Sequence, residues 1–94
     1  MSLTSLQKTD QAAELLKTIA HPIRLRILLA LIEQSSINVS TLQVKLKIDQ
    51  SLLSHHLIKM KDRGLLINAR QGKEIHYSLA DPTFAEAVKM ILPA

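Results

Sequence analysis

The sequence of 94 residues contains no cysteine, only 2 glycines and 3 prolines, and no long apolar run. Without cysteine it cannot form a disulfide framework, a thiolate metal site, an iron–sulfur cluster or a thiol redox switch. No apolar run approaches the roughly 20 residues that span a bilayer, and the N-terminal stretch MSLTSLQKTD lacks a signal-peptide core. We therefore expect a cytoplasmic protein without a membrane partner.

The residues that are present are typical of a packed, helix-rich protein. Hydrophobic residues make up 47% of the chain and charged residues 21%, which indicates a globular domain rather than a disordered segment. A chain of this length normally forms one domain. We therefore expect a single domain over residues 1–94.

The net charge of +4 is concentrated in the middle of the chain. Residues 41–80 contain seven basic and three acidic side chains, whereas the charges of the two flanks nearly cancel. A localised basic segment attracts nucleic-acid phosphates or an anionic membrane surface, and it can equally be a solvated face. The seven basic residues are Lys45, Lys47, Lys59, Lys61, Arg63, Arg70 and Lys73.

Apolar residues recur at helical spacing in four segments before residue 64. Ser40 and Asp49 are suited to cap the third and fourth helices, and Pro22 suits the first turn of the second. Residues 1–9 precede the first periodic segment and are expected to form a loose extension. The expected helices are Asp10–Ala20, Pro22–Gln34, Thr41–Leu46 and Gln50–Arg63.

The pattern then changes to the alternation of a β-strand. Leu65–Arg70 and Glu74–Leu79, joined by a tight turn at Gln71-Gly72, predict a β-hairpin. Asp81 then caps a last helix, Pro82–Leu92. The order α-α-α-α-β-β-α predicts a mainly α protein with a small β-hairpin, which is a winged helix-turn-helix.

Such a fold can read DNA. A helix of about 14 residues with small polar side chains can enter a major groove, where Gln50 can bind adenine, and the hairpin tip can reach the adjacent backbone or minor groove. The candidate phosphate contacts are Lys45, Lys47, Lys59 and Arg63, and those of the hairpin tip are Arg70, Gln71 and Lys73.

Four stretches, in order, resemble the ArsR/SmtB family of small prokaryotic transcriptional repressors. They are AHPIRLRIL at 20–28, DQSLLSHHL at 49–57, GLL at 64–66 and YSL at 77–79. The resemblance implies that Ser51 and Ser54 approach bases or phosphates, that His55 faces DNA, and that His56 contacts a phosphate or packs. Leu52 departs from the family's usual threonine and is a candidate contact to a thymine methyl group.

The resemblance also implies a homodimer that is formed by the first and last helices. Apolar side chains left exposed on these helices would otherwise form a large patch on a monomer. A two-fold dimer would place two recognition helices about one DNA turn apart, on a pseudo-palindromic site. The expected interface residues are Leu15, Leu16, Ile19, Phe84, Val88 and Ile91.

The metal sites known in the family are not expected here. Asn38-Val39-Ser40 stands where one site has Cys-x-Cys. In the other site Asp81 matches the first ligand, but Thr83 and Ala94 stand where histidines would be. We therefore expect no metal and no cofactor.

The leading hypothesis is a DNA-binding transcriptional regulator that acts as a repressor and not as an enzyme, since no phosphate loop, carboxylate pair or triad motif is present. Its expected partners are double-stranded DNA and a second copy. The alternatives are a winged-helix module that binds an acidic protein partner and a histidine-based metal sensor that uses His21 or His76. The inducing signal stays open between a small-molecule effector, a partner protein and constitutive binding.

Overall fold

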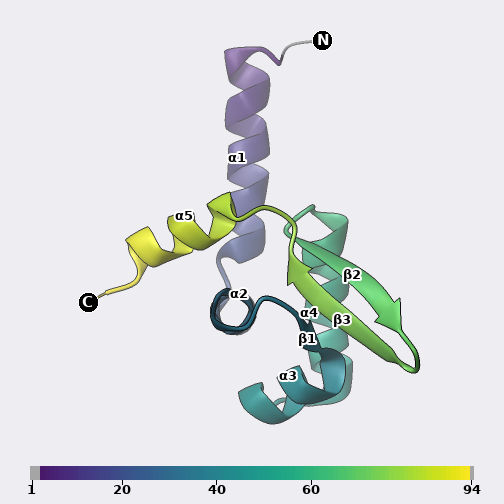
Figure 1. Cartoon of the computed structure of the whole chain (residues 1–94). Coiled ribbons are helices and arrows are strands. Elements are labelled where there is room, and N and C mark those ends of the chain that lie inside the picture. The colour runs from purple at the N-terminus through teal and green to yellow at the C-terminus, as the bar shows by residue number, and fades with distance from the viewer. Residues whose placement is uncertain (1–2, 94) are drawn as a thin grey trace.

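The computed structural model describes residues 3–93 and confirms the predicted winged helix-turn-helix (Figure 1). Within these residues, five helices are interleaved along the chain with the three strands of one antiparallel sheet. None of the helices in the described range is long and apolar enough to cross a membrane. The elements are α1 (Ser5–Ile19), α2 (Pro22–Glu33), β1 (Ile37–Asn38), α3 (Val39–Leu46), α4 (Gln50–Asp62), β2 (Leu66–Gln71), β3 (Glu74–Leu79) and α5 (Thr83–Ile91).

The core lies between the helices and one face of the hairpin. The predicted stripe of α4 is fully buried at Leu53, Leu57 and Met60, because these positions recur on one side of the helix. They belong to one cluster with apolar residues of the other elements. Those residues include Ile27, Leu28 and Leu31 of α2, Leu42 of α3, Leu65, Leu66 and Tyr77 of the hairpin region, and Val88 of α5.

The sheet contains a strand that the sequence did not predict. The two residues of β1 pair with β3, where Ile37 lies opposite Tyr77 and Asn38 opposite His76. The strand order is therefore β1-β3-β2, so that β3 pairs with β1 on one side and with its hairpin partner β2 on the other. This pairing joins the wing to the segment that leads into α3.

Three predicted helix starts are wrong. Helix α5 begins at Thr83 with Pro82 as its N-cap, so Asp81 is not the cap, although its Oδ1 accepts from the backbone N–H of Thr83 at 2.9 Å. Helix α1 begins at Ser5, not Asp10, because Thr4 and Gln7 form a reciprocal capping box. Residues 5–9, which were expected to form a loose extension, are therefore helical. Residues 1 and 2 of that extension lie outside the described residues. Helix α3 is capped by Asn38, whose Oδ1 accepts from the Thr41 backbone N–H at 2.7 Å, and not by Ser40. Figure 1 shows α1 projecting away from the body of the protein.

The turn between α3 and α4 is tight. Asp49 caps α4 as predicted, with Oδ2 accepting from the backbone N–H of Leu52 at 3.2 Å. Lys47 ends α3 in the left-handed conformation, with φ of 54°. A residue with a Cβ atom is disfavoured in this conformation, and glycine is not.

We therefore expect Lys47→Gly to raise the free energy of unfolding by about 0.5–1 kcal/mol, since relief of the left-handed strain exceeds the added flexibility of glycine. Urea unfolding of both proteins measures the change. The matched control is Lys45→Gly inside α3, which should lower the stability by about 1 kcal/mol. A loss of stability in both variants would contradict the assignment of strain to Lys47.

Candidate nucleic-acid interface

Helix α4 turns a polar face to solvent, opposite its buried stripe. Gln50, Ser51, Leu52 and His55 are exposed, and Ser54 is half-buried. The same face continues through Ile58, which is 53% exposed and was not among the predicted residues. The first half of α4 thus offers hydroxyl, amide and imidazole groups on a free helix surface, as readout of base edges requires.

The wing lies beside this face. A groove of about 320 Å³ runs between α4 and the hairpin, and its lining includes Gln50, Ser54 and Ile58 on one side and Lys73 and Ile75 on the other. The structure therefore brings two candidate base contacts and one candidate wing contact to the same concave surface.

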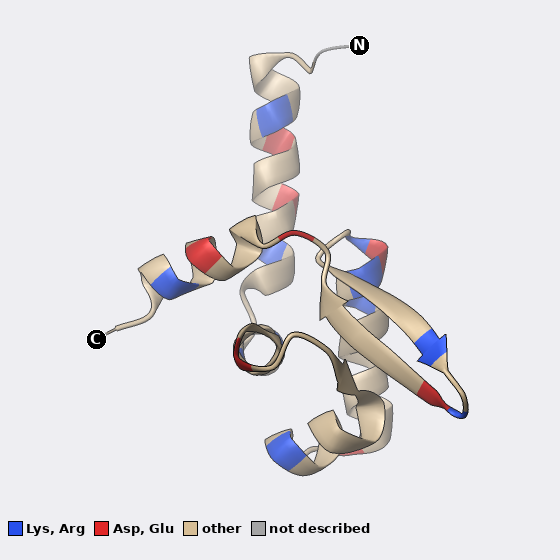
Figure 2. Cartoon of the chain, viewed as in Figure 1, with Lys and Arg blue, Asp and Glu red and all other residues tan. Residues whose placement is uncertain are grey.

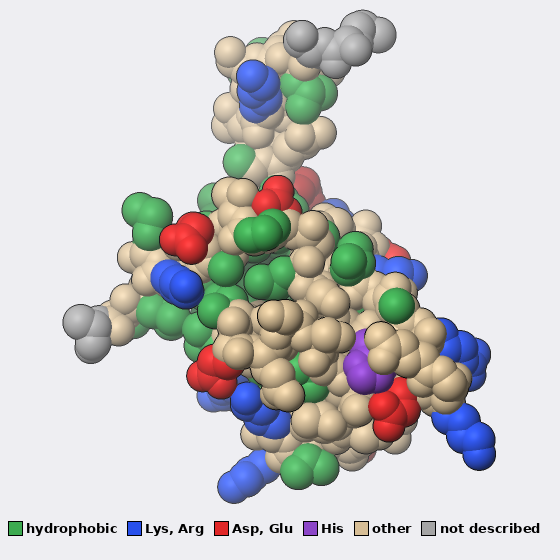
Figure 3. Space-filling model, in the orientation of Figure 1, with side chains coloured by type: hydrophobic (Ala, Val, Ile, Leu, Met, Phe, Trp, Pro, Cys, Tyr) green, Lys and Arg blue, Asp and Glu red, His purple; other side chains and the backbone are tan. Residues whose placement is uncertain are grey.

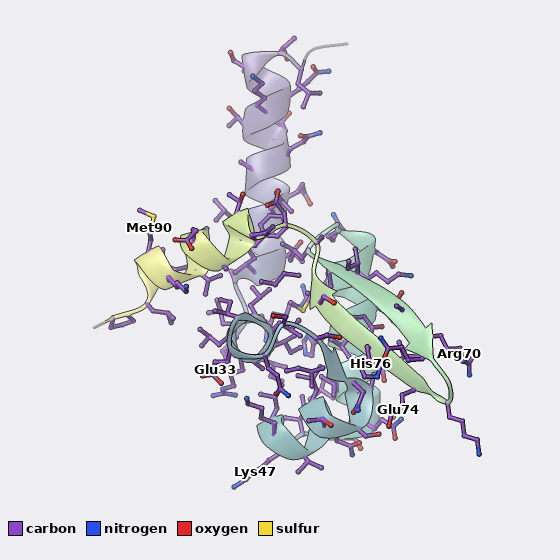
Figure 4. The ribbon with its side chains drawn as sticks, viewed as in Figure 1. Glu33, Lys47, Arg70, Glu74, His76 and Met90 are labelled. Carbon is purple, nitrogen blue, oxygen red and sulfur yellow. The ribbon has the colours of Figure 1, made fainter. Side chains whose placement is uncertain are left out.

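The tip of the wing is exposed. Arg70 and Gln71 are solvent-accessible, and Arg70 extends outward in Figure 4, with its Nε donating to the carbonyl oxygen of Gly72 at 3.3 Å. Gly72 has φ of 64°, a left-handed turn geometry that favours glycine. The tip is therefore a tight turn that presents basic side chains beyond the body of the protein.

A small polar cluster holds the wing against the helix-turn-helix. Glu74 Oε2 accepts from Asn38 Nδ2 at 3.1 Å and lies 3.2 Å from His76 Nε2 (Figure 4). Because Asn38 also caps α3, the carboxylate of Glu74 links the wing to the start of that helix. Asn38 comes within reach of Glu74 because β1 pairs with β3, and the sequence did not predict this pairing.

His56 is not available to DNA, contrary to one of its two predicted roles. Its side chain is buried at 4% exposure, and its Nδ1 accepts from Arg24 Nε at 3.0 Å. Burial, with smaller contributions from His21, Arg24 and His55, lowers the pKa of His56 below its ordinary value, which favours the neutral ring that can accept from arginine. The structure thus places His56 in the packing between α4 and α2.

His21 also has a structural position. Its Nδ1 accepts from the backbone N–H of Ile23 at 3.2 Å and so caps α2, and its ring centroid lies 4.5 Å from that of His56. Within residues 3–93, no three histidine, aspartate or glutamate side chains converge as metal ligands; Ala94, which stands at one family ligand position, lies outside the described residues.

The candidate phosphate contacts differ in their surroundings (Figure 2). Lys45 Nζ pairs with Glu33 at 3.1 Å, and Arg63 Nη1 pairs with Glu14 of α1 at 3.0 Å. Lys47 extends into solvent in Figure 4, and Lys59 and Lys73 are exposed. To contact DNA, Lys45 and Arg63 would therefore have to exchange a carboxylate partner within the protein for a phosphate, which Lys47 would not.

The predicted dimer residues fall into three groups. Ile19 and Val88 are buried at 8% and 1% exposure in the core of the single chain, which corrects their assignment to an interface. Leu15 and Phe84 pack partly against the same core. Leu16 and Ile91 remain 64% and 66% exposed, and Leu6 and Met90, which were not predicted, are exposed at 79% and 85%.

Comparison with known proteins identifies the family. Residues 21–68, which hold α2, α3, α4 and the start of the wing, match the family described as "Bacterial regulatory protein, arsR family". The chain belongs to the arsR family. This confirms the resemblance seen in the sequence and favours a transcriptional regulator over an enzyme and over a protein-interaction module.

Relatives across the arsR family match most of the chain. The transcriptional repressor PagR of Bacillus anthracis is 44% identical over 84 residues, which cover 89% of this chain and 84% of PagR. The biofilm growth-associated repressor of Agrobacterium fabrum is 34% identical over 85 residues, or 90% and 72% of the two chains.

Solved structures of arsR-family proteins share the fold. The crystal structure of PagR superposes with a TM-score of 0.84 at 39% identity, over 94% of this chain and all of that chain. HlyU from Vibrio cholerae gives a TM-score of 0.84 at 27% identity, over 90% and 91% of the two chains. The winged helix is therefore shared with PagR over nearly the whole length of both chains.

Proposed function

We propose that this arsR-family protein is a transcriptional repressor that binds a pseudo-palindromic operator as a homodimer in the cytoplasm, with residues 1–94 acting as one DNA-binding unit. The observation that carries the proposal is the exposed polar face of α4 beside the groove that it shares with the wing. In this proposal α4 enters the major groove and the wing contacts the flanking backbone. Because the chain has no cysteine, its input is not a thiolate-bound metal or a thiol redox change.

The side chains take different roles in the proposed complex. Gln50, Ser51, Ser54 and His55 offer hydrogen bonds to base edges, and Leu52 offers an apolar contact. In this proposal the phosphate contacts are made by Lys47, Lys59, Arg70, Gln71 and Lys73, and these contacts set the affinity and its salt dependence.

The proposed dimer uses an apolar seam on the projecting helix α1. The seam consists of Leu6, Thr9, Ala13 and Leu16, all exposed and spaced three or four residues apart. This spacing places the residues along one face, as in a pair of helices that pack against each other. Figure 3 shows further hydrophobic side chains exposed in the angle between α1 and α5, where a second copy would cover them together with Met90 and Ile91.

Selection of bound sequences from a random DNA library tests the function. We expect enrichment of a pseudo-palindrome whose half-sites lie about one helical turn apart, at about 10 bp. The logarithm of the binding constant should fall linearly with the logarithm of the salt concentration. If the purified protein enriched no sequence at low salt, the proposed function would be wrong.

His55→Ala should lower the affinity for the selected operator at least about 10-fold, because each copy of the dimer loses a base contact worth about 1–3 kcal/mol. Its affinity for unrelated DNA should change less than about twofold. Lys73→Ala is the contrasting variant: it should weaken binding to both sequences alike and reduce the salt slope by about two, one for each copy of the dimer. Gel shifts at several salt concentrations separate the two patterns, and an equal loss on both DNAs for His55→Ala would exclude its role in base readout.

A further inference from the structure

A second concave site lies where α1, α2 and α4 meet, apart from the groove beside the wing. Its volume is about 220 Å³. Four of its side chains are cationic and one is a carboxylate, so the lining has an excess of three positive charges. The lining residues are Glu14, Lys17, Thr18, Arg24, Lys59 and Arg63.

The guanidinium of Arg24 is fixed at this site by two acceptors inside the protein. Its Nε donates to His56 Nδ1 at 3.0 Å, and its Nη1 donates to the carbonyl oxygen of Thr18 at 3.1 Å. An arginine side chain has five N–H donors in a planar arrangement. Two are engaged here, so the others are held in position at the wall of the cavity without a further loss of side-chain freedom on binding.

The carboxylate at the site does not cancel its charge. Glu14 pairs with Arg63 at 3.0 Å and lies 3.6 Å from Lys17. One negative charge is thus shared by two cations, while Arg24 and Lys59 have neutral or solvent surroundings within the lining. Cations that converge in a concave surface raise the local concentration of anions.

We propose that this cavity binds a phosphate group, held by Arg24 with Lys59, Lys17 and Arg63 around it. Arginine offers paired donors to phosphate oxygens, and lysine offers a mobile point charge. Two sources share this chemistry: a small phosphorylated compound that acts as an effector, and a backbone phosphate of bound DNA. Because Arg24 also holds His56 of α4, an occupant would contact the same arginine that positions the recognition helix.

Pyrophosphate is the probe for the first source. The full chain is titrated with sodium pyrophosphate at constant ionic strength, and binding is followed by calorimetry and by the NMR signals of the His21 and His56 rings. We expect saturable binding that Lys59→Gln weakens at least about fivefold and Glu14→Gln tightens about threefold.

Two controls make the same charge changes away from the cavity. Lys61→Gln lies on the exposed side of α4, and Glu86→Gln lies on α5; both should leave the pyrophosphate affinity within about twofold of the parent. Equal weakening by Lys59→Gln and Lys61→Gln would show attraction to net charge alone and would overturn the site.

Loss of DNA affinity identifies the second source. If pyrophosphate does not bind, Lys59→Gln and also Lys17→Gln, whose side chain lines only this cavity, should still weaken binding to DNA of any sequence. Each should reduce the salt slope by about two, one for each copy of the dimer, while Lys61→Gln should not. If Lys59→Gln weakens neither pyrophosphate binding nor DNA binding more than Lys61→Gln does, the proposal is wrong. A chain that binds pyrophosphate through Lys59 but no DNA would retain this site and refute only the proposed repressor function.

Discussion

Replacing Leu16 with glutamate is expected to give a folded monomer that has lost operator binding. Leu16 is 64% exposed on the outward seam of α1 and lies outside the core of the single chain. In the proposed dimer the new carboxylate would be buried against its own copy, which is costly for an unpaired charge. The fold of the single chain should therefore survive while the dimer dissociates.

The loss of binding follows from geometry. A dimer places two recognition helices on two half-sites, and the second contact is made at a high effective concentration. A monomer keeps one half-site, so the operator affinity should fall at least about 100-fold. Analytical ultracentrifugation and gel shifts measure the two effects, and circular dichroism checks that the helices persist.

Gln7→Glu is the matched control for this experiment. It introduces the same side chain in the same helix, at a position off the seam where glutamate can retain the capping box with Thr4. We expect this variant to remain dimeric and to bind the operator like the parent. A Leu16→Glu variant that stays dimeric at micromolar concentration would show that the seam is not the interface.

Helix α1 shows why the face proposed here for the dimer differs in part from the one predicted from the sequence. It has two apolar faces: Leu15 and Ile19 turn toward the core, and Leu6, Ala13 and Leu16 turn outward. Periodicity reveals that apolar residues repeat, but the choice of face depends on packing against α2 and α4, and α4 is remote from α1 in sequence. The capping box of Thr4 and Gln7 was visible in the sequence and would have placed the helix start correctly.

The recognition helix was more predictable than its surroundings. The cap at Asp49 and the buried residues Leu53, Leu57 and Met60 follow from local spacing, and the structure confirms each of them. Strand β1 has only two residues, too few to show alternation. The burial of His56 depends on Arg24, 32 residues away, a contact that no local pattern specifies.

Substitutions at both ends of that contact test its strength. Arg24→Met should lower the free energy of unfolding by about 1–3 kcal/mol, because it leaves the buried Nδ1 of His56 and the carbonyl of Thr18 without their donor. His56→Phe should also destabilise, because Arg24 Nε then loses its acceptor. The double variant replaces both partners with apolar groups, so its cost should fall short of the sum of the single costs by at least about 1 kcal/mol. If the cost of the double variant equals the sum of the two single costs, the two side chains do not interact.

The dependence of stability on pH tests the same contact independently. Because the pKa of His56 is lowered in the folded protein, the unfolded chain binds a proton first as the pH falls below the ordinary histidine value of about 6.5. The stability contributed by neutral His56 is therefore complete above that pH, declines as the pH falls from there to the native pKa, and is lost below it. Urea unfolding between pH 7.5 and 5 should show this decline in the parent and in His55→Phe, whose histidine is exposed. His56→Phe should show a shallower decline, and equal slopes in all three proteins would place the proton uptake at another group.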